Sequence, residues 1–228
     1  MIKDRIDDIR EVISEIKGQA FEDSGVTLIA VSKNKTVDDI REAMEAGITD
    51  IGENKVQELC QKMDEIGDNL NYHMIGNLQS NKVKDIVGRV KLIHSVDRKS
   101  LVKEIEKRCK REGIVQDVLV QVNISKEDTK SGVYVEDLKE LLDFIETKEH
   151  IKVRGLMTMA PYYDNPDDAA WVFAKLKEIF EDIKTMNYNN IEMEYLSMGM
   201  SHDYKIALEN GANMIRVGSY IFGERVYN

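Results

Sequence analysis

Short β-rich runs alternate with longer amphipathic segments along almost the whole chain, and this alternation constrains the fold more than any other feature. Several of the runs are almost continuously apolar, as in Val118-Leu119-Val120-Gln121-Val122. Strands that are buried on both faces of a parallel sheet have this composition. The predicted strands are Val26–Ser32, Asp50–Gly52, Tyr72–Ile75, Lys91–Ser95, Asp117–Asn123, Val153–Met157, Glu194–Ser197 and Met214–Val217.

The segments between these runs carry apolar residues at the i, i+3, i+4, i+7 spacing of helices that face a core. They predict helices near Val37–Glu45, Lys55–Ile66, Gln79–Val87, Lys99–Arg111, Val135–Glu146, Ala169–Met186 and Asp203–Glu209, and the spacing of Ile6, Ile9, Ile13 and Ile16 predicts an extra helix before the first strand. Eight strands alternating with helices predict a (β/α)₈ TIM barrel, with the leading helix in the outer-ring place that an eighth helix would fill. The alternative is an open doubly wound sheet, but no Gly-rich dinucleotide fingerprint follows the first strand.

Composition narrows the class of protein. The 228 residues suit one barrel domain spanning 1–228, because such barrels need roughly 200–250 residues. The formal charge of −10 argues against a nucleic-acid partner, and no apolar run approaches the roughly 20 residues of a membrane span. The N-terminus lacks the apolar core of a secretory signal. Only Cys60 and Cys109 occur, so we expect reduced thiols in the cytoplasm, and the four scattered histidines predict no metal site.

Active sites of such barrels lie at the carboxyl ends of the strands. Lys33 directly follows the first predicted strand, which ends at Ser32, and partial desolvation there would lower the pKa of the amine and make it a nucleophile. A lysine at this position can also simply extend to solvent. Lys35 competes for the same role, but it lies past the strand beside Thr36, the expected cap of the next helix, so we expect it to be solvated.

The ends of the last two strands predict a phosphate site. They read Ser197-Met198-Gly199-Met200-Ser201 and Arg216-Val217-Gly218-Ser219. Barrels often bind phosphate with these two loops and a helix N-terminus. Gly199 and Gly218 would let backbone N–H groups approach the oxygens, and serine hydroxyls would add donors. The plainer alternatives are that Ser201 caps a helix and that Gly218 permits a turn.

The first and last strands of a closed barrel are neighbours. A lysine on one and a phosphate cradle on the other would together hold pyridoxal 5′-phosphate, as an imine to the amine with the phosphate anchored. The sequence therefore predicts a pyridoxal phosphate site with Lys33 at its centre.

The sequence also resembles a known family through motifs that follow one another along nearly the whole chain. They are Ala30-Val31-Ser32-Lys33, Gly52-Glu53-Asn54-Lys55-Val56-Gln57-Glu58, His73-Met74-Ile75-Gly76-Asn77-Leu78-Gln79-Ser80-Asn81-Lys82, His94-Ser95-Val96-Asp97, Val122-Asn123-Ile124, Lys130-Ser131-Gly132, Arg154-Gly155-Leu156-Met157, Leu196-Ser197-Met198-Gly199-Met200-Ser201, Arg216-Val217-Gly218-Ser219 and Ile221-Phe222-Gly223. The chain resembles the pyridoxal phosphate homeostasis protein family, whose barrel is similar to the N-terminal domain of alanine racemase.

The resemblance implies a fold-type III barrel with the cofactor bound as a Schiff base to Lys33. It implies phosphate contacts from Ser197, Ser201, Gly218 and Ser219, with Arg216 at the pyridine nitrogen and Asn54 near the ring. It further implies a part in the balance of vitamin B6 and amino-acid pools without established turnover.

Two classes of function stay open, a cofactor carrier that supplies apo-enzymes and an amino-acid racemase. Arg216 cannot accept a proton from the pyridinium, so it would keep the electron sink weak. A two-base racemase needs a second acid/base group, and only nine residues follow Ser219, too few for the second domain that completes alanine racemase. The substitutes are His73, which we expect in the barrel interior, and the mid-helix Cys60. We therefore expect a carrier rather than an enzyme, as a monomer or weak dimer.

Overall fold

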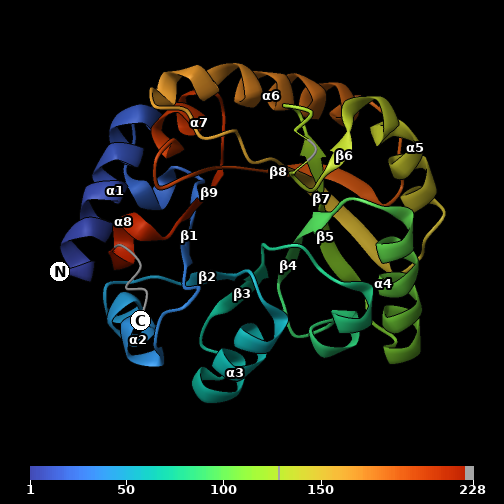
Figure 1. Cartoon of the computed structure of the whole chain (residues 1–228), viewed down its shortest axis with the longest axis horizontal. Coiled ribbons are helices and arrows are strands. Elements are labelled where there is room, and N and C mark those ends of the chain that lie inside the picture. Colours follow the sequence, from blue (N-terminus) through green and yellow to red (C-terminus); the bar gives the residue numbers. More distant parts are fainter. Residues whose placement is uncertain (128, 224–228) are drawn as a thin grey trace.

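The computed structural model describes residues 1–127 and 129–223, and its centre is a closed ring of parallel strands (Figure 1). The eight strands of the ring are β1 (Thr27–Val31), β2 (Asp50–Glu53), β3 (Asn71–Met74), β4 (Leu92–Val96), β5 (Gln116–Asn123), β7 (Ile151–Met157), β8 (Ile191–Met200) and β9 (Met214–Val217). Their order is β4-β3-β2-β1-β9-β8-β7-β5, and the pairing of β4 with β5 closes the ring. The predicted barrel is confirmed, and the open doubly wound sheet is excluded.

Helices form an outer layer around this ring (Figure 1). They are α1 (Ile2–Lys17), α2 (Val37–Glu45), α3 (Val56–Ile66), α4 (Lys99–Glu112), α5 (Val135–Glu146), α6 (Ala170–Lys184), α7 (Tyr204–Glu209) and α8 (Ser219–Phe222), with short 3₁₀ helices η1 (Phe21–Asp23), η2 (Ser80–Asp85) and η3 (Pro166–Ala169). Helix α1 closes the layer beside the last strand, because Lys17 Nζ donates to the Leu208 carbonyl (3.1 Å) and Arg5 Nη1 to the Ile221 carbonyl (3.1 Å). The leading helix therefore takes the predicted place in the outer ring.

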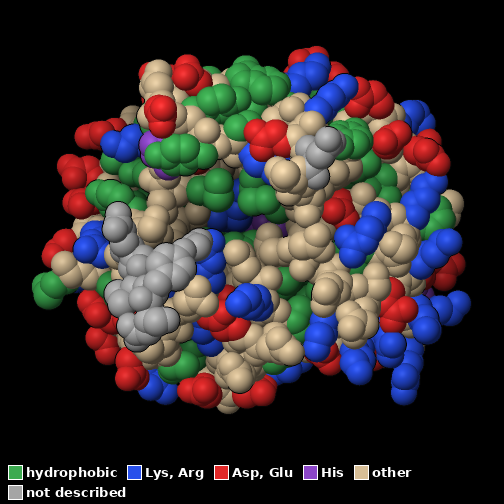
Figure 2. All heavy atoms as spheres, viewed as in Figure 1, with side chains coloured by type: hydrophobic (Ala, Val, Ile, Leu, Met, Phe, Trp, Pro, Cys, Tyr) green, Lys and Arg blue, Asp and Glu red, His purple; other side chains and the backbone are tan. Residues whose placement is uncertain are grey.

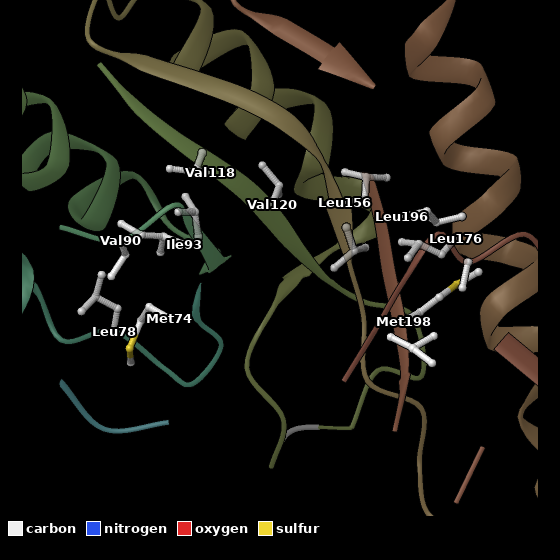
Figure 3. Close-up of a cluster of buried hydrophobic side chains, with 14 of the residues drawn as sticks. Met74, Leu78, Val90, Ile93, Val118, Val120, Leu156, Leu176, Leu196 and Met198 are labelled. Atoms are coloured by element: carbon white, nitrogen blue, oxygen red, sulfur yellow. The ribbon is translucent and has the colours of Figure 1, made fainter. Parts of the chain in front are cut away.

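Alternation along each strand separates two cores. In β4, Ile93 faces the large core between the strands and the helices, whereas Leu92 faces the small core inside the barrel. Figure 3 shows the large core, where side chains of neighbouring strands lie beside Leu176 of α6. The small core consists of Ile29, Leu92, Leu119, Met157 and Met214. It fills only part of the barrel interior, and buried polar side chains occupy the rest.

Among the elements that differ from the sequence expectations are η2, β6 and β8, and the helices α8, η1 and η3 were not predicted. The segment near Gln79–Val87 forms the 3₁₀ helix η2 instead of an α-helix, and it buries Val83 within the helix and Ile86 directly after it. Strand β6 (Val133–Tyr134) was not predicted, and it adds a two-residue edge beside β5. Strand β8 continues three residues past its predicted end at Ser197.

Candidate functional site

A cavity of about 420 Å³ lies at the carboxyl ends of the strands. Its lining is Val31, Lys33, Lys35, Asn54, Ile75, Met159, Tyr162, Met200, Ser201, His202, Arg216, Gly218, Ser219 and Gly223. Figure 2 shows a hollow at the centre of this face with cationic and histidine side chains deep inside it. Six of the eight predicted site residues therefore meet in one cavity: Lys33, Asn54, Ser201, Arg216, Gly218 and Ser219.

A tight turn after β1 fixes the position of Lys33. The Lys35 amide donates to the Ser32 carbonyl (2.9 Å), and the Ser32 amide donates to Gly52 of the neighbouring strand (3.1 Å). Asn34 has a φ of 59°, a left-handed conformation that asparagine tolerates better than most residues. Its amide donates to a carboxylate oxygen of Glu58 at 2.5 Å. The lysine is therefore presented to the cavity by a turn that is bonded on both sides.

A buried ion cluster supports this turn from behind, and it was not predicted from the sequence. Lys62 of α3 donates to the Ser32 carbonyl (2.6 Å) and to Glu58 (2.8 Å), and it forms an ion pair with Glu53. The Ser32 hydroxyl donates to the same Glu53 oxygen at 2.6 Å. Burial raises the pKa of Glu53, and the Lys62 charge opposes that rise. Only the position of Glu53, one residue before Asn54 at the end of β2, hinted at a role near the site.

Lys35 is not solvated as expected. Its Nζ donates to the Phe222 carbonyl at 2.9 Å and to the Gly223 carbonyl at 3.5 Å. These carbonyls are at the end of α8, where helix geometry leaves them without partners in the helix itself. Lys35 therefore lines the cavity and holds α8 against it, so the prediction of a solvent-facing side chain was wrong.

Ser201 joins the loops that follow β8 and β9. Its Oγ accepts the amide of Gly218 (3.1 Å) and the amide of Tyr220 (3.3 Å), so it caps α8 across the chain instead of its own helix α7. A Cβ atom at Gly218 would lie 3.1 Å from the Val31 side chain and 3.2 Å from the Val31 carbonyl. The absence of a side chain there keeps the loop close to β1 and to the turn of Lys33.

Ser197 and Gly199 do not line the cavity. Ser197 is fully buried in the barrel interior, and its hydroxyl bonds to His94 and to Arg216. Gly199 has a φ of +90°, and a Cβ atom there would lie 2.6 Å from Ala207 Cβ and 3.0 Å from Tyr204 Cα. Gly199 therefore permits the close packing of α7 on β8, and the structure brings neither residue to the predicted phosphate loops.

Arg216 lies between the barrel interior and the cavity. Its Nη1 donates to Ser197 Oγ at 2.5 Å, and its Nη2 donates to the Thr158 carbonyl at 2.9 Å. Burial lowers the pKa of Arg216 to about 10, and the charge of Asp203 acts in the opposite direction. The guanidinium is therefore charged at neutral pH, although its hydrogen-bond partners are uncharged groups.

The two remaining acid/base candidates of the sequence lie away from the cavity. His73 is fully buried in the barrel interior, as expected, and it bonds to Asp50 and His94. Cys60 lies in α3, where its Sγ approaches the Asp85 carbonyl at 3.5 Å. Burial raises the pKa of this thiol, which favours the protonated and less reactive form.

An aromatic pair at the rim of the cavity was not predicted. The rings of Tyr162 and His202 stack with centroids 4.7 Å apart and an interplanar angle of 22°. His202 Nε2 donates to the Tyr163 carbonyl (2.9 Å), which fixes this ring, while the Tyr162 side chain is 77% exposed.

In residues 1–127 and 129–223 no cluster of His, Cys, Asp or Glu is suited to hold a metal ion, and no helix there is long and apolar enough to cross a membrane.

Comparison with known proteins gives consistent matches over nearly the whole chain. The family model described as "Alanine racemase, N-terminal domain" matches residues 5–226. The pyridoxal phosphate homeostasis protein of Aquifex aeolicus is 46% identical over 201 residues, which cover 88% of this chain and 87% of that protein. Its counterpart from Helicobacter pylori (strain ATCC 700392 / 26695) is 38% identical over 202 residues, 87% of this chain and 88% of the other. The structure of PipY from Synechococcus elongatus with PLP bound has a TM-score of 0.85 at 32% identity and covers 98% of this chain and 100% of that chain.

The closed parallel barrel, with a lysine after its first strand and an arginine on its last, defines the class of the protein. It is a barrel of the type found in the N-terminal domain of alanine racemase. The chain belongs to the pyridoxal phosphate homeostasis protein family within that class.

Proposed function

We propose that this protein binds pyridoxal 5′-phosphate through an imine to Lys33 and takes part in intracellular vitamin B6 and amino-acid homeostasis as a carrier. One observation carries the proposal: Lys33, Arg216 and the Ser201 loop line the same cavity. A volume of about 420 Å³ is within the usual range for sites of small ligands and cofactors, about 300–1,000 Å³.

The donors of the cavity suit the three parts of this cofactor. The amine of Lys33 would condense with the aldehyde and release water. Ser201, Ser219 and the backbone beside Gly218 would bind the phosphate, since Gly218 keeps this loop close to β1 and to the turn of Lys33. The Arg216 guanidinium can only donate hydrogen bonds, so it would bind the unprotonated pyridine nitrogen. Asn54 lines the same cavity and is our candidate for a contact with the ring.

The names of the relatives support this assignment. Two relatives at 46% and 38% identity are called pyridoxal phosphate homeostasis protein, and the PipY structure at 32% identity holds PLP. We further propose that the protein works in the cytoplasm as a monomer or weak dimer and that its partners are apo-enzymes that need the cofactor. Its two cysteines, Cys60 and Cys109, are free thiols, as cytoplasmic proteins usually have.

An amino-acid racemase is the second candidate, and one observation favours it. His202 and Tyr162 are acid/base groups and both line the cavity. However, His202 Nε2 is bonded to the Tyr163 carbonyl, and an arginine at the ring nitrogen would keep the electron sink weak. These two features support a carrier over an enzyme.

Reductive labelling tests the attachment site. The protein is mixed with pyridoxal 5′-phosphate and treated with borohydride, and its peptides are mapped by mass spectrometry. We expect the pyridoxyl group on Lys33 and loss of the visible imine band in Lys33→Ala. Lys35→Ala is the matched control, since it removes a lysine of the same cavity and should keep the label on Lys33. Label on Lys35, or none at all, would overturn the proposal.

A further inference from the structure

The barrel interior holds a continuous chain of hydrogen bonds that starts at Arg216. Arg216 Nη1 lies 2.5 Å from Ser197 Oγ, which lies 3.0 Å from His94 Nδ1. His94 Nε2 is 3.0 Å from His73 Nδ1, and His73 Nε2 is 2.8 Å from Asp50 Oδ1. These five buried residues belong to β9, β8, β4, β3 and β2, so the chain crosses the interior from one strand to another. We call it the relay.

The two ends of the relay determine where its protons lie. A guanidinium can only donate and a carboxylate can only accept, so Asp50 accepts from His73 Nε2–H. His73 Nδ1 then accepts from His94 Nε2–H, and His94 Nδ1 accepts the hydroxyl proton of Ser197. The Ser197 oxygen in turn accepts from Arg216. Every bond has one donor and one acceptor when both rings are neutral, and burial lowers the pKa of both histidines, which favours that state.

The relay connects two cavities at opposite ends of the barrel. Arg216 lines the cavity of Lys33 at the carboxyl ends of the strands. Asp50 is the first residue of β2 and lines a second cavity of about 310 Å³ beside Thr27, Leu28 and Thr49 at the amino ends. The far end of the relay therefore lies beside residues that do not line the cavity of Lys33.

Asp50 is anchored as the anionic end of the relay. Its carboxylate accepts from Thr49 Oγ1 (2.8 Å), Asn71 Nδ2 (3.2 Å) and Lys91 Nζ (3.3 Å) besides His73. Burial alone would raise the pKa of Asp50, but the contacts with His73, Thr49 and Lys91 lower it below its usual range. The carboxylate thus stays ionised at neutral pH and orients the His73 ring.

The relay ends on a guanidinium that lacks a hydrogen-bonded carboxylate among the described contacts. Arg216 bonds to Ser197 and to the Thr158 carbonyl, while Asp203 acts on its charge without a hydrogen bond that the structure records. Hydrogen bonds in a chain polarise one another in a low-dielectric interior. An anion at Asp50 therefore strengthens each acceptor along the chain, from His73 Nδ1 up to the Ser197 oxygen that accepts from Nη1 of Arg216.

The polar composition itself points to a role beyond filling space. The other part of the interior is packed with apolar residues such as Ile29, Leu119 and Met214. Burying two imidazoles, a hydroxyl and a carboxylate costs more free energy than the same volume of apolar side chains unless every group is bonded. We propose that Asp50, His73 and His94 are positioning residues for the cofactor site, which set the orientation and polarity of Arg216 from the opposite end of the barrel. This inference rests on the proposed function, in which Arg216 faces the pyridine nitrogen.

Asp50→Asn tests the relay from its far end, because the amide keeps the shape and an acceptor oxygen but removes the charge. We expect the dissociation constant for pyridoxal 5′-phosphate to rise between about twofold and thirtyfold, the range found for mutations that act between distant sites. The absorbance maximum of the bound cofactor should shift as well. Glu22→Gln is the matched control, since it removes a carboxylate that lines the same second cavity without a recorded bond to Asp50, and it should leave both quantities close to wild type. Wild-type affinity and spectrum in Asp50→Asn would overturn the inference.

Nitrogen-15 NMR of the protein without cofactor gives a second measurement that does not depend on the proposed function. We expect both histidines as Nε2–H tautomers, and we expect Asp50→Asn to move the resonances of His94 and of the Arg216 guanidinium. Ser197→Ala, which breaks the relay by loss of one oxygen, should move the Arg216 signals and uncouple them from Asp50→Asn. Changes that stop at His73 would refute the relay. Coupled resonances together with no label on Lys33 would instead overturn the proposed function and, with it, the cofactor role of the relay.

Discussion

Two buried cations hold the two sides of the cavity in different ways. Lys62 lies between the carboxylates of Glu53 and Glu58, so its charge is neutralised directly and its third bond fixes Ser32. Arg216 bonds to uncharged partners and keeps its charge available to the cavity. The first cation therefore stabilises the turn of Lys33, and the second remains able to bind a ligand acceptor.

Ser201→Ala tests the phosphate side of the cavity. The Ser201 oxygen already accepts two amides, so its own O–H is left to donate to an anion in the cavity. Loss of this donor should weaken the binding of pyridoxal 5′-phosphate by about 1–2 kcal/mol, near tenfold. Titrations followed by absorbance measure the effect, with pyridoxal as the matched ligand without phosphate. An equal loss of affinity for both ligands would contradict a phosphate contact at Ser201.

Lys62→Met should reveal the buried Glu53 carboxylate through the pH dependence of stability. Removing one partner of a buried ion pair costs about 3–5 kcal/mol of unfolding free energy. Burial raises the folded-state pKa of Glu53, so the folded chain holds its proton more tightly than the unfolded chain does. Stability from this group is then present at low pH and is lost as the pH rises through the folded-state pKa. The deficit of Lys62→Met relative to wild type should therefore be largest at neutral pH and narrow in acid.

The double variant Glu53→Gln, Lys62→Met is the control for this prediction. It lacks both charges, so its deficit relative to wild type should be smaller at neutral pH and nearly independent of pH. Urea unfolding at several pH values measures all three proteins. A deficit of Lys62→Met that stays constant with pH would contradict the assignment of the effect to Glu53.

Ser197 and Lys35 were misplaced because their surroundings depend on tertiary structure that the local sequence does not show. Ser197 was expected at the end of its strand, but β8 continues to Met200, so Ser197 lies within the strand and faces the interior. Lys35 was expected in solvent because its partners, the carbonyls of Phe222 and Gly223, are 187 and 188 positions away in the chain. Lys33 and Gly218 follow directly from the strand-end rule for barrels, which needs no knowledge of partners.

Helices and strands with a regular spacing of apolar residues were predictable, because one buried face is enough to specify the type of element. The isoleucines of α1 and the apolar run of β5 settle their element type without tertiary information. The 3₁₀ helix η2 and the strand β6 depend on tertiary packing. Their six and two residues are too few to show a regular spacing of apolar side chains. The loops that line the cavity lie between helices and strands with such regular spacing, and for that reason most of the cavity could be predicted.

Gly199→Ala tests how far the packing of α7 on β8 controls the cavity. A methyl group there would meet Ala207 Cβ at 2.6 Å and the backbone of Tyr204 at 3.0 Å, and the φ of +90° adds strain. The helix must shift, and Ser201, which lies between β8 and α7, shifts with it. We expect a loss of more than about 2 kcal/mol of unfolding free energy, in the upper part of the usual range for single substitutions, together with weaker cofactor binding.

Gly113→Ala, at the end of α4, is the matched control for Gly199→Ala. Gly113 also has a positive φ, +67°, but a methyl group there would have no neighbour within 4 Å. It should cost only the strain of the left-handed conformation, about 1–2 kcal/mol, with unchanged affinity for pyridoxal 5′-phosphate. Equal effects of the two substitutions on affinity would contradict a role of the α7 packing in the site.

At the scale of the whole molecule, the closed barrel brings groups from the two ends of the chain together. The pairing of β1 with β9 places Lys33, near the start of the sequence, across the same cavity from Arg216 and Ser219. The stacked rings of Tyr162 and His202 line the same cavity at its rim.

Exchange and transfer measured on the same preparation separate a carrier from a racemase. If His202 stays bonded to the Tyr163 carbonyl and the Tyr162 side chain stays exposed at the rim, the site lacks a second acid/base group opposite Lys33, and a missing group of this kind typically costs 10²–10⁴ in rate. We therefore expect little α-deuteration of L-amino acids by proton NMR in D₂O, together with transfer of the cofactor to an apo-transaminase faster than simple dissociation delivers it. His202→Gln should leave the transfer rate unchanged and lower any residual deuteration. Deuteration at about 10 turnovers per second, the median for enzymes, would contradict the carrier assignment and favour a racemase.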